Sequence, residues 1–215
     1  MKLYLKQLEL GPLQNFVYLI GSLETREAAV VDPAWDVPRI LETARADEMR
    51  ITTAIVTHTH FDHVNGVEEL VRTTDAQVVI HKREASFLPV NKSNVKAIEG
   101  GQEISFGPLT LSFIHTPGHT PGSQCVTVGD RLIAGDTLFI GGCGRCDLPG
   151  GDPEALHQSL SRLSRLDDRM ILYPGHNYAV QPTSTIEEEK SINPFLRAKN
   201  LEGFLHLVGG VKKKV

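Results

Sequence analysis

The pattern of hydrophobic and polar positions predicts a chain rich in short strands. Apolar runs or alternating stretches occupy residues 2–10, 15–20, 27–31, 51–57, 77–81, 109–115, 124–128, 131–134 and 170–173. The stretch 51–57 is rich in β-branched residues, which is typical of a buried strand. Gly11 and Pro12 separate the first two runs and indicate a hairpin.

Helical spacing of apolar residues recurs between these strands. One helix is expected from Asp36, whose side chain can cap it. Further helices are expected from just after residue 63 to about residue 74, after residue 152, over 184–193 and over about 201–208. Residues 82–101 are predicted as a short helix followed by an irregular connection. Many strands with interspersed helices indicate two sheets with helices outside.

Length and composition limit the possible classes. The chain has 215 residues, of which 40% are hydrophobic, and this suits a single domain over 1–215 with 183–208 as a short C-terminal helical segment. A formal charge of −4 argues against a nucleic-acid partner. No apolar stretch reaches membrane-spanning length, no signal peptide opens the chain, and three cysteines form no disulfide framework. We therefore expect a cytoplasmic protein without a membrane partner, and the sequence leaves its oligomeric state open.

The stretch His58–His63 carries the strongest chemical signal. It places three imidazoles and the carboxylate of Asp62 directly after the predicted strand 51–57. So many polar groups cannot easily be satisfied inside a core, whereas a metal ion satisfies them together. If the stretch is extended, His58, His60 and Asp62 share one side and His63 turns toward a second position. This geometry indicates two metal ions.

Three later residues have the same setting at strand ends. His119, Asp136 and His176 each stand beside glycine or proline, which fix tight turns and allow close backbone approach. Each is a weak signal alone. Together with the first cluster they predict one metal site assembled from distant parts of the chain.

The order of these residues resembles the metallo-β-lactamase superfamily. Gly135-Asp136-Thr137-Leu138-Phe139 and Gly142-Cys143-Gly144-Arg145 are similar to its glyoxalase II and persulfide dioxygenase branches. The resemblance implies an α/β fold, a four-layer αββα sandwich with the metal site at one edge. It also implies two divalent metal ions, with these ligands: His58, His60 and His119 for one, Asp62, His63 and His176 for the other, and Asp136 between them. Zinc is the first choice, and ligand type leaves iron and manganese open.

The resemblance implies hydrolysis by a metal-bound hydroxide, with Asp62 and Asp136 as the catalytic carboxylates. No Gly-x-Ser-x-Gly nucleophile motif is present in the sequence. The first hypothesis is a glyoxalase II-like thioesterase that acts on acyl-glutathione or a similar small thioester. Arg145 and Tyr178 are candidates for substrate contact. Asp32, at a strand end, is either a support for the site or a turn cap.

Two alternatives remain open from the sequence. Arg145-Cys146-Asp147 is similar to the Arg-x-Asp of persulfide dioxygenases, which use iron and act on glutathione persulfide. The chain also stops near residue 215 without the helical tail of many glyoxalase II enzymes. Lactone hydrolysis, and a binding module with a vestigial site, are further possibilities, although no ligand of the pattern is missing.

Overall fold

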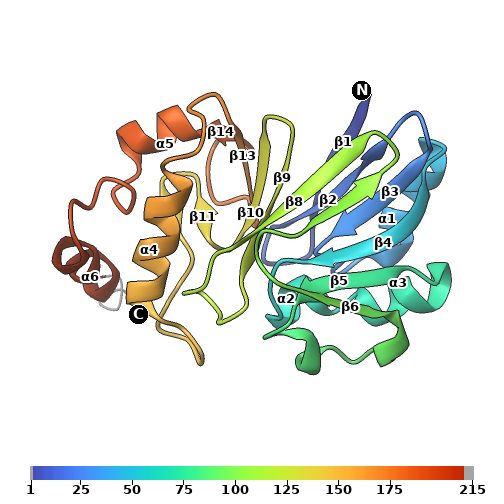
Figure 1. The fold of residues 1–215 in the computed structure, drawn as a ribbon, viewed down its shortest axis with the longest axis horizontal. Coiled ribbons are helices and arrows are strands. Elements are labelled where there is room, and N and C mark those ends of the chain that lie inside the picture. The colour runs from blue at the N-terminus through green and yellow to red at the C-terminus, as the bar shows by residue number, and fades with distance from the viewer. Residues whose placement is uncertain (1, 211–215) are drawn as a thin grey trace.

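The computed structural model describes residues 2–210 as two facing β-sheets with helices on both outer sides (Figure 1). Helices α1 (Val37–Ala46) and α3 (Val67–Thr74) accompany the amino-terminal sheet, and α4 (Pro153–Leu163) accompanies the second sheet. The resulting order of layers is α, β, β, α. This confirms the αββα sandwich.

The amino-terminal sheet has the strand order β1-β2-β3-β4-β5-β6. Its strands are β1 (Leu3–Leu10), β2 (Asn15–Ser22), β3 (Glu27–Val31), β4 (Arg50–Val56), β5 (Gln77–His81) and β6 (Val95–Ile98). β1, β2 and β3 pair antiparallel, as expected for strands joined by short turns, whereas β3 to β6 pair in parallel.

The second sheet has the strand order β14-β13-β10-β9-β8-β7. Its strands are β7 (Glu103–Phe106), β8 (Leu109–His115), β9 (Gln124–Val128), β10 (Arg131–Gly135), β13 (Ile171–Pro174) and β14 (Ser184–Thr185), and β11 (Leu138–Phe139) pairs separately with β12 (Gly142–Cys143). β10 and β13 are parallel neighbours.

The helices begin where the sequence predicts caps. Asp36 accepts a hydrogen bond from the backbone N–H of Arg39 at 3.0 Å, and Asp152 accepts one from Ala155 at 3.0 Å. The remaining helical elements are α2 (Phe61–Val64), α5 (Ile186–Ile192), α6 (Leu201–Gly210) and the 3₁₀ turns η1 (Ala85–Phe87) and η2 (Lys92–Asn94). Within residues 2–210, no helix combines the length and apolar character needed to cross a bilayer.

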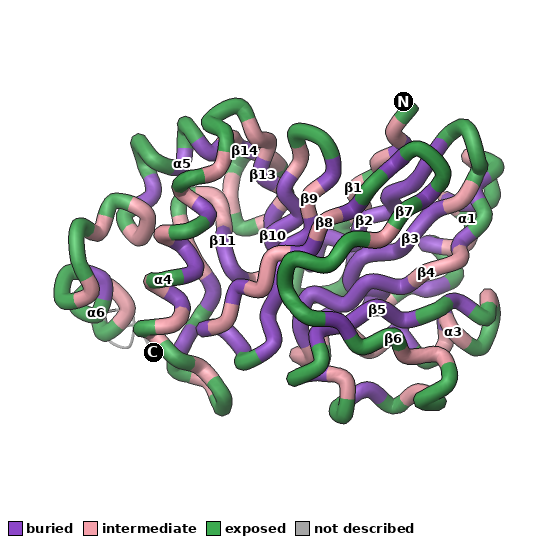
Figure 2. The backbone as a smooth tube through the Cα atoms, viewed as in Figure 1, coloured by how far each residue is buried: buried purple, intermediate pink, exposed green. Residues whose placement is uncertain are grey.

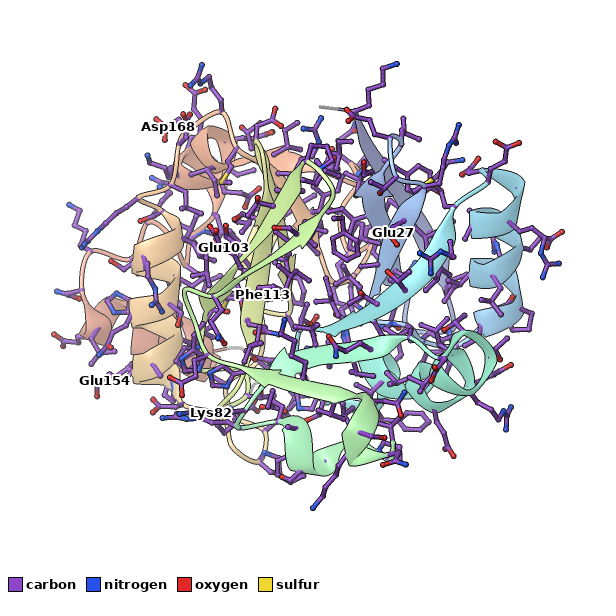
Figure 3. The ribbon with its side chains drawn as sticks, turned by 45° about the vertical axis from the view of Figure 1, so that its right-hand side comes forward. Glu27, Lys82, Glu103, Phe113, Glu154 and Asp168 are labelled. Carbon is purple, nitrogen blue, oxygen red and sulfur yellow. The ribbon has the colours of Figure 1, made fainter. Side chains whose placement is uncertain are left out.

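Three apolar clusters fill the spaces between the layers. Alternation along β2 sends Val17 and Leu19 toward the outer helices, and Tyr18 and Ile20 toward the facing sheet. Phe113 of β8, labelled near the middle of Figure 3, belongs to the cluster between the sheets. A third cluster joins the second sheet to α4, α5 and α6. Figure 2 shows the result as buried strands flanked by exposed helix surfaces.

The prediction for residues 82–101 is partly wrong. Two 3₁₀ turns replace the expected helix, and β6 extends the amino-terminal sheet beyond β5. Strands β7, β11, β12 and β14 were also not predicted. Each of these strands has only two to four residues, and each includes partly or fully exposed positions. Short edge strands of this kind lack the apolar run that reveals a buried strand.

Candidate metal centre

The candidate ligands other than His119 follow the carboxyl ends of two pairs of parallel strands, and His119 lies in the loop between the antiparallel strands β8 and β9. Asp32 follows β3, and the cluster that begins at His58 follows β4. Asp136 follows β10, and His176 stands two residues after β13. Parallel neighbours end at the same edge of a sheet, so each pair is brought together by the pairing itself.

Backbone hydrogen bonds join the two sheets at this edge. The N–H of Gln124 donates to the carbonyl of Thr57 at 3.0 Å, and the N–H of Phe16 donates to the carbonyl of Gly175 at 2.8 Å. These bonds hold the β4 end against β9 and the β13 end against β2. The site is therefore built on fixed strand ends.

The chain changes conformation inside the cluster. His60 is extended, with φ −64° and ψ 143°, and α2 begins at Phe61. Asp62 and His63 therefore lie in the first turn of a helix. The expected alternation, which placed Asp62 on the side of His58 and His60, is wrong because the helical turn carries Asp62 to the side of His63.

Two groups of ligand atoms converge at the edge. Within each group, the atoms lie within 4.8 Å of one another: one group is His58, His60 and His119, and the other is Asp62, His63 and His176. A third set within the same limit, Asp32, His58 and His63, shares its two histidines with these groups. Oxygens of Asp136 lie between them, at 3.3 Å from Nε2 of His63, 3.6 Å from Nε2 of His119 and 3.4 Å from Nε2 of His176. All seven side chains named from the sequence thus meet in one place.

Two of the histidines are oriented by backbone carbonyls. Nδ1 of His119 lies 2.6 Å from the carbonyl oxygen of Arg145, and Nδ1 of His176 lies 2.9 Å from that of Leu13. A carbonyl oxygen only accepts, so each Nδ1 carries the proton and donates it. In its neutral form, each ring then holds its lone pair at Nε2.

Two more histidines are oriented through Asp32. Nδ1 of His63 donates to Oδ2 of Asp32 at 3.0 Å, and the hydroxyl of Thr57 donates to the same oxygen at 2.6 Å. Because its proton is committed to Asp32, the Thr57 hydroxyl can only accept from Nδ1 of His58, which lies 3.0 Å away. In their neutral forms, His58 and His63 therefore also hold their lone pairs at Nε2.

These Nε2 atoms face one another in pairs. Nε2 of His58 lies 3.2 Å from Nε2 of His119, and Nε2 of His63 lies 3.2 Å from Nε2 of His176. Two lone pairs at this distance repel unless a proton or a cation is shared between them. Imidazole nitrogens with nearby carboxylates are a donor set that zinc, iron and manganese accept. The residues therefore fit a metal centre.

The surroundings of Asp136 support the same conclusion. Its Oδ1 atom is buried and has no hydrogen-bond partner within residues 2–210. A Cβ atom added at Gly175 would lie 2.3 Å from this oxygen, and one added at Gly144 would lie 1.8 Å from the Asp136 carbonyl oxygen. Glycine at 175 leaves room for the carboxylate, and glycine at 144 leaves room for the Asp136 backbone. A cation would satisfy the unpaired oxygen.

Charge within the site also favours a cation. Burial lowers the pKa of His58 and of His119, which keeps both rings neutral. Burial also lowers the pKa of His63, but the carboxylates of Asp136 and Asp32 outweigh it and raise that pKa well above its usual value. Burial raises the pKa of Asp136, but His63 and His176 outweigh it and lower that pKa. The Asp136 carboxylate is thus charged and favours a proton on His63. An incoming metal ion would displace this proton.

Asp32 supports the metal centre. The sequence allowed either this role or that of a turn cap. Its Oδ1 atom accepts the backbone N–H of Thr57 at 2.7 Å, and its Oδ2 atom accepts from Thr57 and His63. The residue is only 4% exposed and has a φ of 51°. One carboxylate therefore orients two imidazoles from outside the ligand groups.

Asn15 and Trp35 are site residues that the sequence did not reveal. Nε1 of Trp35 can only donate, and it donates to Oδ1 of Asn15 at 2.8 Å, which turns the amide group of Asn15 toward Asp62. Nδ2 of Asn15 then donates to Oδ2 of Asp62 at 2.9 Å. No local motif predicts this contact, because 47 residues separate Asn15 from Asp62.

Glu84 was also missed. It is 2% exposed and accepts hydrogen bonds from the backbone N–H groups of Thr59 at 3.2 Å and Gly122 at 2.8 Å, and from the Thr59 hydroxyl. Thr59 stands between His58 and His60, and Gly122 belongs to the turn that carries His119. A single carboxylate thus joins the two loops of the first ligand group.

Arg145 and Tyr178 lie beside the centre. The carbonyl of Arg145 holds His119, while its guanidinium forms two hydrogen bonds with the Asp147 carboxylate, at 3.0 and 3.1 Å. The ring of Tyr178 is 60% exposed and stacks on His176, with ring centroids 4.7 Å apart. Arg145 thus adjoins the first ligand group through its backbone carbonyl, and Tyr178 adjoins the second through its ring.

The site is a largely buried set of imidazoles and carboxylates at one edge of an αββα sandwich. This combination indicates a metal-dependent enzyme. Residues 10–176 match the family described as the metallo-beta-lactamase superfamily. The chain belongs to this superfamily, as its residue pattern indicated.

Several curated relatives are similar over most of the chain. The probable polyketide biosynthesis zinc-dependent hydrolase PksB of Bacillus subtilis is 32% identical over 192 residues, covering 89% of this chain and 85% of the relative. Persulfide dioxygenase ETHE1 of Homo sapiens is 34% identical over 203 residues, covering 92% and 77%. A hydroxyacylglutathione hydrolase of Anaeromyxobacter dehalogenans is 33% identical, covering 85% and 82%. The relatives thus include both reactions considered from the sequence.

Solved structures give the same picture. ETHE1 from Myxococcus xanthus has a TM-score of 0.89 and 34% identity, and the match covers 97% of this chain and 91% of the other. A protein crystallised in a di-iron-bound form has a TM-score of 0.79 and 32% identity, covering 89% and 100%. The fold is therefore shared with both solved structures over most of their length, and one of them contains two iron ions.

Proposed function

We propose that the protein is a thioester hydrolase that acts on acyl-glutathione or a closely related small thioester at a two-metal centre. The observation that carries this proposal is the second ligand group, Asp62, His63 and His176, which stands complete beside the first. His58, His60 and His119 would hold one cation, the second group the other, and Asp136 would contact both. The bound cations supply an activated water molecule and polarise the substrate carbonyl.

Protein side chains orient this reaction and accept its protons. Water adds to the thioester carbonyl carbon, the carbon–sulfur bond breaks, and the products are a carboxylic acid and a thiol. We assign proton acceptance to Asp62, whose side chain is 17% exposed, because Asp136 is the more enclosed carboxylate at 11%. Asn15 holds Oδ2 of Asp62 in place through its amide group. Asp136 stays ionised between the two ligand groups.

We assign substrate contact to Arg145 and Tyr178. Two nitrogens of the Arg145 guanidinium are engaged by Asp147, which leaves Nη1 to approach a carboxylate of the thiol carrier. The exposed ring of Tyr178 lies over the second ligand group, where the acyl end would sit. Small glutathione-derived substrates are consistent with the names of two relatives, the hydroxyacylglutathione hydrolase and the persulfide dioxygenase.

The metal is proposed to be zinc, with iron or manganese able to occupy the same ligands. The zinc-dependent hydrolase name of PksB supports zinc, and the di-iron form of the similar structure supports iron. The di-iron form also supports a centre with two ions, and the name of PksB also supports hydrolysis. Imidazole and carboxylate ligands do not discriminate between these metals.

Persulfide dioxygenase activity is the second candidate. The observation that favours it is the paired Arg145 and Asp147 beside His119, which is the Arg-x-Asp feature noted in the sequence. Similarity to ETHE1 at 34% identity adds to it. In this case His58, His119 and Asp136 would hold a single iron with open positions for oxygen.

The two candidates are separated by running two assays on one metal-loaded sample. Hydrolysis is followed with S-lactoylglutathione and other S-acyl glutathiones, and oxygen consumption is followed with glutathione persulfide. We expect hydrolysis, and we expect Asp62→Asn to lower kcat by about 10²-fold or more. Asp36→Asn, which turns an exposed carboxylate into an amide that also caps a helix well, is the matched control and should leave the rate unchanged. Oxygen uptake without thioester hydrolysis would reverse the order of the candidates.

A further inference from the structure

Large apolar side chains are exposed next to the second ligand group. Phe61 is 71% exposed and lies in the chain directly between His60 and Asp62, and Leu13 is 48% exposed. The carbonyl of Leu13 accepts the hydrogen bond of His176 at 2.9 Å, so this residue also adjoins the site. Exposed apolar residues are ordinary when scattered, but a group beside a ligand site indicates a binding surface.

Trp35 adjoins Phe61 and is held in place by contacts with four residues. Its ring meets the ring of Phe61 edge to face, with centroids 6.1 Å apart. Its Nε1 donates to Asn15, and its backbone N–H donates to Oδ1 of Asn65 at 2.7 Å. A Cβ added at Gly11 would lie 2.4 Å from the ring, so the indole packs directly on the Gly11 backbone.

The backbone of Trp35 is strained, with a φ of 64°. A bulky residue in the left-handed region is a genuine outlier, and such strain persists only where the surrounding contacts fix it. Here, the contacts with Asn15 and Asn65 fix it. The strained turn keeps the half-buried indole at the edge of the site, within two hydrogen bonds of Asp62.

The opposite side of the centre has a different character. The backbone carbonyl of Arg145 holds His119, and the guanidinium of Arg145, 63% exposed, pairs with the Asp147 carboxylate in the same loop. The first ligand group is therefore bordered by charge and the second by hydrocarbon. A substrate that spans the centre would place its polar end at the first ligand group and its apolar end at the second.

We propose that Leu13, Trp35 and Phe61, which we call the apolar rim, bind the hydrocarbon part of the acyl group and make the enzyme selective for apolar acyl thioesters over short hydroxyacyl thioesters. This inference rests on the proposed thioester hydrolysis and adds the acyl class to it. The thiol carrier then extends toward Arg145. Each methylene that the rim removes from water should improve binding about two- to fourfold.

Binding can be measured without turnover. S-alkyl glutathiones with ethyl, butyl, hexyl and octyl groups are thioethers and are not hydrolysed, and Trp35 is the single tryptophan of the chain. Its fluorescence therefore reports occupation of the rim directly. We expect the dissociation constant to fall about two- to fourfold for each added methylene. A dissociation constant that does not change with chain length would overturn the inference.

Two rim variants and one control locate the effect. Phe61→Ala and Leu13→Ser replace exposed side chains, and each should flatten the dependence on chain length while metal content and circular dichroism stay unchanged. Phe87→Ala removes a phenylalanine that is 69% exposed in η1, outside the rim, and should keep the full dependence. If both rim variants keep the wild-type dependence, the assignment of the rim is wrong.

Hydrolysis of the matching thioesters separates this inference from the proposed function. With acetyl, butyryl, hexanoyl and octanoyl glutathione, we expect kcat/KM to rise with chain length and to exceed the value for S-lactoylglutathione. Hydrolysis with no preference for longer chains would overturn the apolar rim and leave the thioesterase standing. Binding that depends on chain length without any hydrolysis would overturn the thioesterase and leave the rim as an apolar ligand site.

Discussion

Asp32 is the residue through which the arrangement of the metal centre can be tested most cleanly. Its carboxylate accepts from the Thr57 N–H, the Thr57 hydroxyl and Nδ1 of His63. Asp32→Asn keeps the shape and tolerates the φ of 51°. The amide offers one acceptor oxygen and one donor group in place of two acceptor oxygens. If the amide oxygen still accepts the hydrogen bond from the Thr57 N–H, the amide NH₂ group faces Nδ1 of His63.

The consequence falls on the tautomer of His63. Two donors cannot share a hydrogen bond, so the ring must move its proton from Nδ1 to Nε2 or leave the donor unsatisfied. A proton on Nε2 occupies the lone pair that faces His176 at 3.2 Å. The second ligand group then lacks one of its three donors. The first group keeps all three donors as long as the Thr57 hydroxyl still accepts from Nδ1 of His58.

The size of the effect follows from ligand orientation. Loss of a partner that orients a ligand typically weakens metal affinity by about 10- to 100-fold. At a metal concentration 100 times the wild-type dissociation constant, binding adds about 2.7 kcal/mol to the free energy of unfolding. The variant should retain only about 1.4 kcal/mol after a tenfold loss and about 0.4 kcal/mol after a 100-fold loss.

The assay is a competition titration against a chromophoric zinc chelator, followed by thermal unfolding with and without metal. Asp32→Asn should show one site near wild-type affinity and one weakened site, with a smaller stabilisation by metal. Asp36→Asn is the matched control and should titrate like the wild type. A folded Asp32→Asn protein that binds both ions with wild-type affinity would refute the tautomer reasoning.

Three further predictions concern the structure around the site. Glu84→Ala leaves the N–H groups of Thr59 and Gly122 without their acceptor, and should lower the free energy of unfolding by about 2–5 kcal/mol; unchanged urea unfolding would contradict this. Phe113→Ala, at a position 1% exposed between the sheets, should cost about 3–5 kcal/mol in the same assay, and a smaller loss would mean that the core collapses into the space. Burial lowers the pKa of His81 from 6.5 to about 4, so the unfolded chain is protonated first and stability falls as pH drops from 6.5 toward 4. His81→Gln should lose less stability than the wild type between pH 7 and pH 5, and equal losses would count against this role.

The long strands could be predicted from the sequence because their apolar runs are continuous. Residues 109–115 and 124–128 form strands with the expected bounds. The short edge strands could not, because β6 and β7 are each buried at only one of four positions. Their place is set by pairing with β5 and β8, and that information lies in the partner strand.

The candidate site also contains residues that the sequence could predict and residues that it could not. Residue types and order were enough to name seven side chains, and the family resemblance grouped Asp62 with His63 and His176, as the structure does. Strand alternation alone placed Asp62 with His58 and His60, because it could not show that α2 begins inside the cluster. Asn15, Trp35 and Glu84 could not be named at all. Each acts through hydrogen bonds to residues far along the chain, and only the folded chain brings these groups together.

The number of metal ions per chain tests the central claim most directly. Two complete ligand groups and facing Nε2 atoms predict two ions, with Asp136 in contact with both. Elemental analysis of protein reconstituted with zinc and passed through a desalting column measures this number. The account predicts two zinc ions per chain. One ion or none, in protein that is folded by circular dichroism, would contradict it.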